Sequence, residues 1–304
     1  MSRHFLIFTP LLLTGCIETG LTMVPGGAGS AVDANDDTGE WTQDPEEEAD
    51  PEPNPEQEQK ESLEAPEDDC DDTSDLVYVI DKDTAGLYLF NPQTYGYEFL
   101  GDLDCGTYAG TPASMSVSRD GFAYVRYADD TVYSVDLVSM ECNETPYGTN
   151  FGGFGMGYAT EDNNTWQDHL YVANASQLAT IDTQNWKLSV IGKLPSQSEL
   201  TGNAEGELWA MLPLETPAEL VQLNKSNANV AKRIKLPGFP NPYEIDTFAF
   251  ATWGGDFWLF IRTSGMGSST DIYRVTAAGK MTRVVTDSGL NVVGAGVSTC
   301  APTE

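Results

Sequence analysis

The sequence contains little positive charge and almost no histidine. Its 15 lysine and arginine residues stand against 47 aspartate and glutamate residues, which gives a formal net charge of −32 at pH 7. Proteins bind nucleic acids through basic surfaces, so this composition argues against nucleic acid as a partner. The two histidines are His4, near the N-terminus, and His169, before a predicted strand. Neither is supported by a second histidine or a serine motif, so we assign no catalytic residue and interpret His169 as a surface or strand-end residue.

The sequence also lacks the patterns of metal and cofactor sites. No Cys-x-x-Cys pair occurs, and the acidic and amide cluster at 161–164 does not have the alternating spacing of a calcium-binding loop. No glycine-rich loop leads from a predicted strand into a helix, which argues against a nucleotide site. We therefore expect neither a metal nor a cofactor.

Residues 1–15 have the pattern of a secretory signal peptide. Arg3 supplies a positive start, and small residues follow the apolar run at 5–13. This run is much shorter than the roughly 20 residues of a membrane-spanning helix. The segment therefore predicts export rather than a transmembrane anchor.

The end of this segment, Leu13-Thr14-Gly15-Cys16, resembles the lipobox of bacterial lipoproteins. The resemblance implies cleavage before Cys16 and diacylation of its sulfur. Because Ile17 rather than aspartate comes next, it also implies an anchor in the outer membrane. The alternative is an ordinary secretory signal followed by an unrelated cysteine. We expect the protein to lie in the cell envelope, with the membrane as its partner through the lipid.

Residues 16–75 predict a disordered acidic linker. About 21 of the 47 acidic residues lie here, Lys60 is the only basic residue, and prolines recur throughout. Such a segment has too little apolar surface to offset the entropy that ordering would cost. We interpret it as an extended spacer; binding of calcium or of a cationic surface is the less supported alternative.

Residues 76–304 contain an internal repeat. A line of one apolar residue, two variable residues, a second apolar residue and a short polar residue occurs five times, about 42 to 52 residues apart. This is the period of a four-stranded propeller blade, so the segment predicts an all-β, five-bladed β-propeller. A sixth blade hidden in the longer insertion at 160–168 is the alternative. The five lines begin at Leu87, Val132, Leu178, Leu220 and Ile272.

Four of the repeats contain an additional strand of small residues, as expected nearest a propeller axis, where backbones converge. The first repeat lacks it, because Leu76 follows directly on the linker. The segment Gly294–Ser298, at the other end of the chain, has the missing composition. We therefore expect the C-terminal strand to complete the first blade and close the ring, which removes the exposed sheet edges.

Five cysteines are present, and the lipid accounts for Cys16. The other four allow three disulfide pairings in an exported protein. The ring favours two of the possible bonds. A Cys70–Cys300 bond would lock the closing strand, and a Cys105–Cys142 bond would join the outer strands of blades one and two.

Two groups of residues are candidates for ligand binding. Aromatic residues on the loops between blades could stack on sugars or anchor a protein; the alternative is that they fill the core between blades. Acidic residues stand where inner strands begin and could border a central funnel, although nothing pairs them as glycoside hydrolysis requires. The aromatic candidates are Tyr108, Tyr147, Phe151, Phe154, Phe239 and Tyr243, and the acidic candidates are Glu199, Glu244 and Asp246.

The repeated line, together with the phrase at 112–121, resembles repeat lipoproteins of bacterial envelopes and, more distantly, lactonase-like and quinoprotein-like propellers. The resemblance does not identify a functional site in this sequence, because we find neither a series of quinone-docking tryptophans nor a set of metal-binding carboxylates. Since propellers perform many functions, the fold alone does not select one. We expect a monomeric, lipid-anchored propeller that binds an envelope protein or glycan without catalysis. An envelope hydrolase or lyase, and a purely structural surface protein, are the alternatives.

Overall fold

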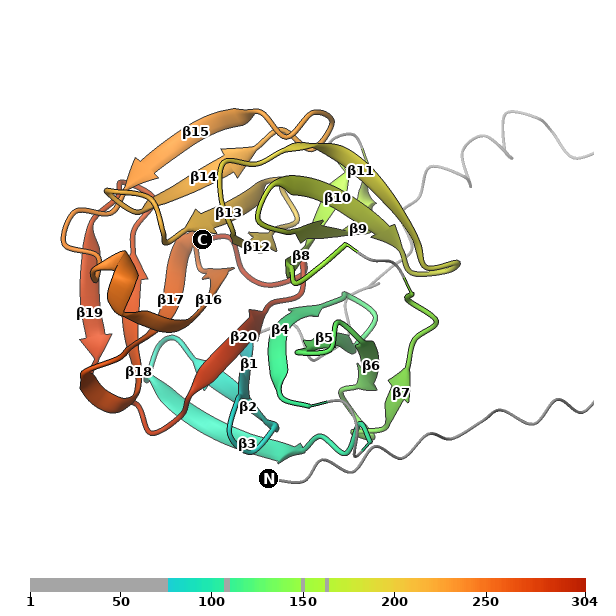
Figure 1. Cartoon of the computed structure of the whole chain (residues 1–304), viewed down its shortest axis with the longest axis horizontal. Coiled ribbons are helices and arrows are strands. Elements are labelled where there is room, and N and C mark those ends of the chain that lie inside the picture. The colour runs from blue at the N-terminus through green and yellow to red at the C-terminus, as the bar shows by residue number, and fades with distance from the viewer. Residues whose placement is uncertain (1–75, 107–109, 149–150, 162–163) are drawn as a thin grey trace, which may run out of the picture. The chain divides into compact units, whose positions relative to one another are not determined.

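A computed structural model describes residues 76–304 except 107–109, 149–150 and 162–163 (Figure 1). The predicted signal peptide and acidic linker lie outside the described residues. Within the described part of the chain, no helix is long and apolar enough to cross a membrane.

The described residues form five four-stranded antiparallel sheets arranged as blades around a central axis (Figure 1). This confirms the five-bladed propeller, and the alternative with six blades is wrong. From the axis outward, the strands are β20 (Val292–Gly296), β1 (Val77–Asp81), β2 (Gly86–Asn91) and β3 (Gly96–Asp102) in blade one; β4 (Pro112–Val117), β5 (Phe122–Tyr127), β6 (Val132–Asp136) and β7 (Cys142–Glu144) in blade two; β8 (Gly155–Glu161), β9 (Asn164–Ala173), β10 (Gln177–Asp182) and β11 (Lys187–Lys193) in blade three; β12 (Glu199–Gly202), β13 (Leu208–Leu212), β14 (Glu219–Leu223) and β15 (Val230–Lys235) in blade four; and β16 (Ile245–Trp253), β17 (Asp256–Thr263), β18 (Met266–Val275) and β19 (Met281–Val285) in blade five. A short 3-10 helix, η2 (Pro242–Glu244), precedes β16.

The short polar residue that ends each repeated line begins a tight turn. In four blades its side-chain oxygen accepts a hydrogen bond from the backbone amide two residues later, at 2.8 to 3.0 Å. Its carbonyl oxygen accepts a second bond from the amide four residues later, and that later residue has a positive φ. The side chain therefore holds the chain in the reversal that joins the third strand to the outer strand. The four residues are Asn91, Asp136, Asp182 and Asn224.

Small residues on the inner strands are required by close packing at the axis. A Cβ atom on Gly202 of β12 would lie 2.3 Å from the carbonyl oxygen of Tyr158 on β8. A Cβ atom on Gly155 of β8 would lie 2.4 Å from the carbonyl oxygen of Ser198. Both distances are too short for real contacts, so the backbones of blades three and four can approach this closely only because these positions are glycine.

The C-terminal strand completes the first blade, as the sequence predicts. β20 pairs antiparallel with β1, and Tyr78 lies opposite Gly296. Gly296 also lies against blade two, where an added Cβ would be 2.9 Å from the backbone nitrogen of Val117. The backbone amide of Asn291 donates to a carboxylate oxygen of Asp81 at 2.6 Å and fixes the start of the strand.

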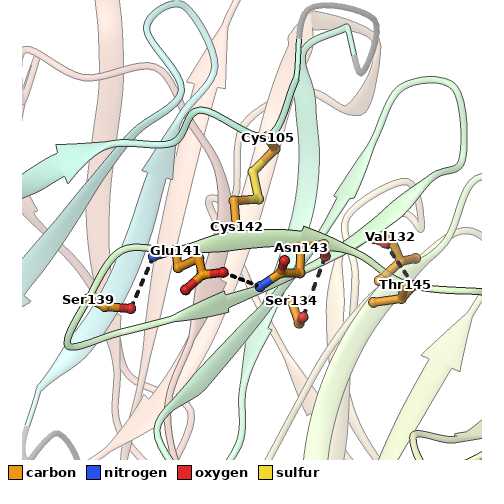
Figure 2. Close-up of a disulfide and its surroundings, with 8 residues drawn as sticks. All are labelled: Cys105, Val132, Ser134, Ser139, Glu141, Cys142, Asn143 and Thr145. Carbon is orange, nitrogen blue, oxygen red and sulfur yellow. Dashed lines mark hydrogen bonds between the residues drawn. A yellow bond between two sulfur atoms is a disulfide. The ribbon is translucent and has the colours of Figure 1, made fainter.

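A disulfide joins blades one and two. Cys105, after β3, and Cys142, on β7, have sulfur atoms 1.97 Å apart and Cα atoms 5.1 Å apart (Figure 2). This confirms the predicted pair. Nearby, the Thr145 hydroxyl donates to the carbonyl oxygen of Val132 at 2.7 Å, which holds the end of the short outer strand (Figure 2). Cys300 also takes part in a disulfide; Cys70 lies outside the described residues, so its pairing with Cys300 stays a prediction.

Removal of residues 288–304 should unfold the whole ring rather than fray one end. The truncation deletes β20, which exposes the inner edge of β1 and removes the packing partner of β4 and β16. Hydrogen exchange and urea unfolding of the full and truncated chains would measure the effect. Native protection of blade three in the truncated chain would contradict the prediction, and deletion of Thr303 and Glu304 alone, which lie outside any strand, is the control.

Candidate functional site

A cavity of about 340 Å³ lies at one end of the propeller axis. We call this end the front face, because the inner strands start there; it also carries the loops that join one blade to the next. Residues at the starts of four inner strands, β4, β12, β16 and β20, line the cavity, together with Arg126 of β5. We call it the axial cavity. The cavity is concave, as ligand sites usually are. Residues from most of the blades line it.

Glu199, the first residue of β12, is buried in the wall of the axial cavity. The Ser114 hydroxyl on β4 donates to its Oε2 atom at 2.8 Å. Burial raises the pKa of Glu199 to about 8; the Ser114 hydroxyl, the Arg126 charge and the Met156 amide only partly offset this rise. The carboxyl group is therefore mostly protonated, and neutral, at neutral pH.

Arg126 places a positive charge beside the same cavity. Its side chain is buried, its Nε donates to the carbonyl oxygen of Phe154 at 2.8 Å, and its Nη1 donates to the carbonyl oxygen of Tyr127 and to Asp130, both at 3.1 Å. The guanidinium carbon lies 5.3 Å from the centre of the Phe154 ring. These contacts come from several directions, so the guanidinium group is held in one place.

Two further charged residues line the axial cavity. Asp246 forms an ion pair with Arg262 at 2.9 Å, so its charge is largely compensated. Lys82, between β1 and β2, is half-buried, and its backbone amide donates to the carbonyl oxygen of Asn291 at 2.8 Å. Among the described residues, no carboxylate lies within ion-pair distance of the Lys82 ammonium group.

The three acidic candidates do not form one group. Glu199 and Asp246 line the axial cavity, whereas Glu244 lines a separate depression of about 500 Å³ with Tyr273 and Arg283 of blade five. A role for Glu244 in the axial cavity has no support in this arrangement.

The aromatic candidates are distributed among the blades. Tyr147 and Phe154 are buried with their ring centres 5.6 Å apart, and Phe151 packs against Phe154 at 6.0 Å. Phe239 packs partly buried against the core of blades four and five, while Tyr243 is 94% exposed. Tyr108 lies outside the described residues. None of the five described residues lines the axial cavity, and their role in binding stays a prediction.

Arg126 and Lys82 are not among the site residues predicted from the sequence. A charged residue within the otherwise apolar strand Phe122–Tyr127 is the signal that could have identified Arg126, because a buried arginine needs partners that the fold must supply. Lys82 has no such signal, since it lies in a loop and only the closure of the ring brings it to the axis.

The opposite, rear face contains several structural contacts. Arg119 forms two hydrogen bonds to the Asp168 carboxylate, at 2.8 and 2.9 Å, and a third to Thr299 of the C-terminal segment at 3.1 Å. His169, on β9, lies with its Nε2 atom 2.6 Å from a Glu161 carboxylate oxygen and is not part of the axial cavity. In the part of the chain that the structure describes, no group of three or more histidine, cysteine or acidic side chains could hold a metal ion.

A second cavity on the rear face, of about 210 Å³, lies between blades four and five. Trp209 and Trp253 line it, and the C-terminal residues Ala301–Thr303 form part of its wall. The amide of Gly254 donates to the carbonyl oxygen of Pro302 at 2.7 Å, so the C-terminal segment is fixed against this cavity.

Comparison with known proteins shows no relationship that assigns a function. No protein-family model and no curated protein matches the chain. Among solved structures, a protein of unknown function from Bacteroides thetaiotaomicron is 13% identical, with a TM-score of 0.42, over 70% of this chain and 56% of its own. An auxiliary nutrient binding protein from the same organism is 11% identical, with a TM-score of 0.39, over 68% of this chain and 53% of its own. A luciferin-regenerating enzyme is 11% identical, with a TM-score of 0.42, over 70% of this chain and 76% of its own. The chain thus spans just over half the length of the two Bacteroides structures, and similarities of this size say nothing about its activity.

The Glu199→Gln substitution should change how stability depends on pH. Because burial raises the pKa of Glu199, the folded protein binds more protons than the unfolded chain between pH 4.5 and about 8, so Glu199 lowers the free energy of unfolding across this range as pH rises. Glutamine removes this loss, which is at most about 5 kcal/mol. Urea unfolding of both full-length proteins would measure the free energy of unfolding at about pH 5 and at about pH 9. The stability of the variant relative to the parent should be greater at about pH 9 than at about pH 5.

The control is Glu98→Gln, at an exposed position on β3. It should shift the stability of the protein equally at both pH values. An equal shift for Glu199→Gln as well would mean that the buried carboxyl is ionised in the folded state.

Proposed function

We propose that the protein is a lipid-anchored binding module of the bacterial cell envelope that takes its ligand in the axial cavity. The observation that carries this proposal is the pair of buried ionisable groups, Glu199 and Arg126, that line one open cavity at the axis. Burial of such groups costs stability, and folded domains retain them mainly where the site uses them.

The location rests on the N-terminal sequence. A short signal peptide ending in Leu13-Thr14-Gly15-Cys16 supports lipid attachment at Cys16, and the acidic segment that follows supports a spacer between the lipid and the propeller. Ile17 supports the outer membrane as the destination.

The position of β1 is compatible with this arrangement. The axial cavity includes Val293, at the start of β20, whereas the start of β1 lies near the other end of β20, where Tyr78 pairs with Gly296. The linker would therefore join the propeller on the rear face. A ligand could then reach the front face without passing the point of attachment.

A second candidate function is hydrolysis or elimination in the same cavity. One observation favours it: Glu199, mostly protonated at neutral pH, and Asp246, paired with Arg262, line one site. Glycoside hydrolases use one protonated and one ionised carboxyl group. If this function is correct, turnover of an envelope glycan will be lost in both Glu199→Gln and Asp246→Asn, while a purely binding protein will show no turnover in any form.

The Cys16→Ser variant should lose its membrane attachment. The sulfur of Cys16 is the predicted site of diacylation, and two acyl chains are needed for stable anchoring. In a bacterium that processes lipoproteins, labelled fatty acid should enter the parent protein but not the variant, and the variant should move to the soluble envelope fraction. Equal labelling of both proteins would contradict lipidation at this residue.

A bulky residue at the mouth of the axial cavity should abolish ligand binding. Thr111 is an exposed residue on the rim, so Thr111→Trp should fill the cavity without disturbing the core. Binding of envelope glycans on an array, and capture of envelope proteins, would be compared for the parent and variant chains after their melting temperatures are shown to match.

The control for this experiment is Tyr243→Ala. Tyr243 is the most exposed of the aromatic candidates and lies outside the axial cavity, so its substitution should leave binding unchanged. If Tyr243→Ala abolishes binding and Thr111→Trp does not, the aromatic loop is the binding site and the cavity is not.

A further inference from the structure

The charge around the axial cavity differs from that of the propeller as a whole. Residues 76–304 contain 13 basic and 26 acidic residues, so the propeller is negative overall. The cavity is nevertheless lined by two cations, Lys82 and Arg126, and by two carboxyl groups. Asp246 is paired with Arg262 and Arg126 with Asp130, while Glu199 is buried and hydrogen-bonded. Among the described residues of the wall, the charge without an ion pair is therefore the positive charge of Lys82.

Both cations line the same cavity, and the contacts of Arg126 fix its orientation. The Nε and Nη1 atoms of Arg126 are engaged by Phe154, Tyr127 and Asp130, which orients the planar group. Gly153 lies beside the guanidinium group. A Cβ atom at this position would be 3.7 Å from Nη1, which is an ordinary contact distance. The remaining nitrogen of this fixed guanidinium group, Nη2, has no hydrogen-bond partner among the described residues and can donate to an anionic oxygen such as that of a carboxylate.

The rest of the wall suits a hydroxylated molecule. Thr111 and Gln197 are exposed on the rim and offer hydrogen-bonding groups, and Phe248 provides an apolar surface for a ring. The volume of about 340 Å³ is at the small end of the range for ligand pockets. This combination fits one or two sugar rings better than a peptide segment.

We therefore infer that the axial cavity binds a carboxylate-bearing sugar, such as a uronic acid residue of an envelope glycan, and that Arg126 and Lys82 hold its carboxylate. This inference rests on the proposed function, because it assigns a ligand class to the same cavity. Glu199 lies within the site as a neutral group that accepts from Ser114 and can donate its own proton to a sugar oxygen.

Binding of an acidic sugar in this cavity should depend on pH. The groups around Glu199 are the Ser114 hydroxyl on β4, Arg126 on β5 and the Met156 amide on β8, and Lys82 and Asp246 line the same cavity. When Glu199 ionises, the cavity gains a negative charge that repels a carboxylate. Since the pKa of Glu199 is raised to about 8, binding should be strong below this pH and weaken above it.

Calorimetric titration of the full-length chain tests the inference, with D-glucuronate and, as the neutral sugar of the same shape, D-glucose. Glucuronate should bind at least about tenfold more tightly than glucose at about pH 6.5, and its affinity should fall at about pH 9. Lys82→Ala, which removes a charge, and Arg126→Lys, which removes the Nη2 donor, should each weaken glucuronate binding by about tenfold. Glu199→Gln, which cannot ionise, should remove the fall in glucuronate affinity between about pH 6.5 and about pH 9.

The control variant is Lys187→Ala, on the outer strand β11, which should bind glucuronate like the parent. If Arg126→Lys folds poorly, Lys82→Ala in the half-exposed loop provides the same comparison. Equal or tighter binding of glucose would overturn the preference for an acidic sugar and leave the binding function in place. Failure of both sugars would also overturn it, and the glycan array and protein capture would then decide whether the cavity binds anything else. Unchanged glucuronate affinity in both cation variants would place the ligand elsewhere.

Discussion

The close approach of the five inner strands is the constraint on which the structure depends. Each inner strand lies against its neighbours on both sides, so no blade has a complete environment until the ring is closed. Gly155 and Gly202 show how little room remains, because even one additional carbon atom would overlap a carbonyl group of the adjacent blade. The last strand, β20, must supply the fifth inner surface, which makes the two ends of the folded segment parts of the same blade.

The same convergence creates the axial cavity. Where the inner strands start, their backbones no longer fill the axis, and side chains such as Glu199, Asp246 and Arg126 lie around the opening. Removal of a carboxyl group from water favours its neutral form, whereas a guanidinium group stays charged and must be held by acceptors. Arg126 receives these acceptors from the carbonyl groups of Tyr127 and Phe154 and from Asp130. The fold thus sets the ionisation of the site as well as its shape.

The sequence predicts the fold far better than it predicts the site. The repeated line is visible because each blade needs the same apolar spacing, and the turn that follows it needs a short polar residue such as Asn91 or Asp182. The closure by Gly294–Ser298 follows from the one repeat that lacks a small-residue strand. The Cys105–Cys142 bond follows from placing adjacent blades side by side, and it is confirmed.

Site residues are harder to find because they depend on which side chains from distant segments meet. Lys82, Arg126 and Glu199 are far apart in the chain and share no pattern, so only the ring brings them to one cavity. Aromatic residues mislead for the opposite reason. Phe154 is aromatic, as many ligand-contacting residues are, but it is buried under Arg126. It contributes to the site by orienting the Arg126 side chain.

The place of β1 within blade one has a mechanical consequence. β1 carries the first residues of the folded segment and is hydrogen-bonded on both sides, to β20 and to β2. A pull at the start of β1 therefore acts along the strand and loads both ladders in shear, so their hydrogen bonds share the force. A chain that entered through an outer strand such as β3 would instead be peeled away bond by bond. A propeller that the chain enters through β1 is suited to remain folded when a force acts on the start of this strand.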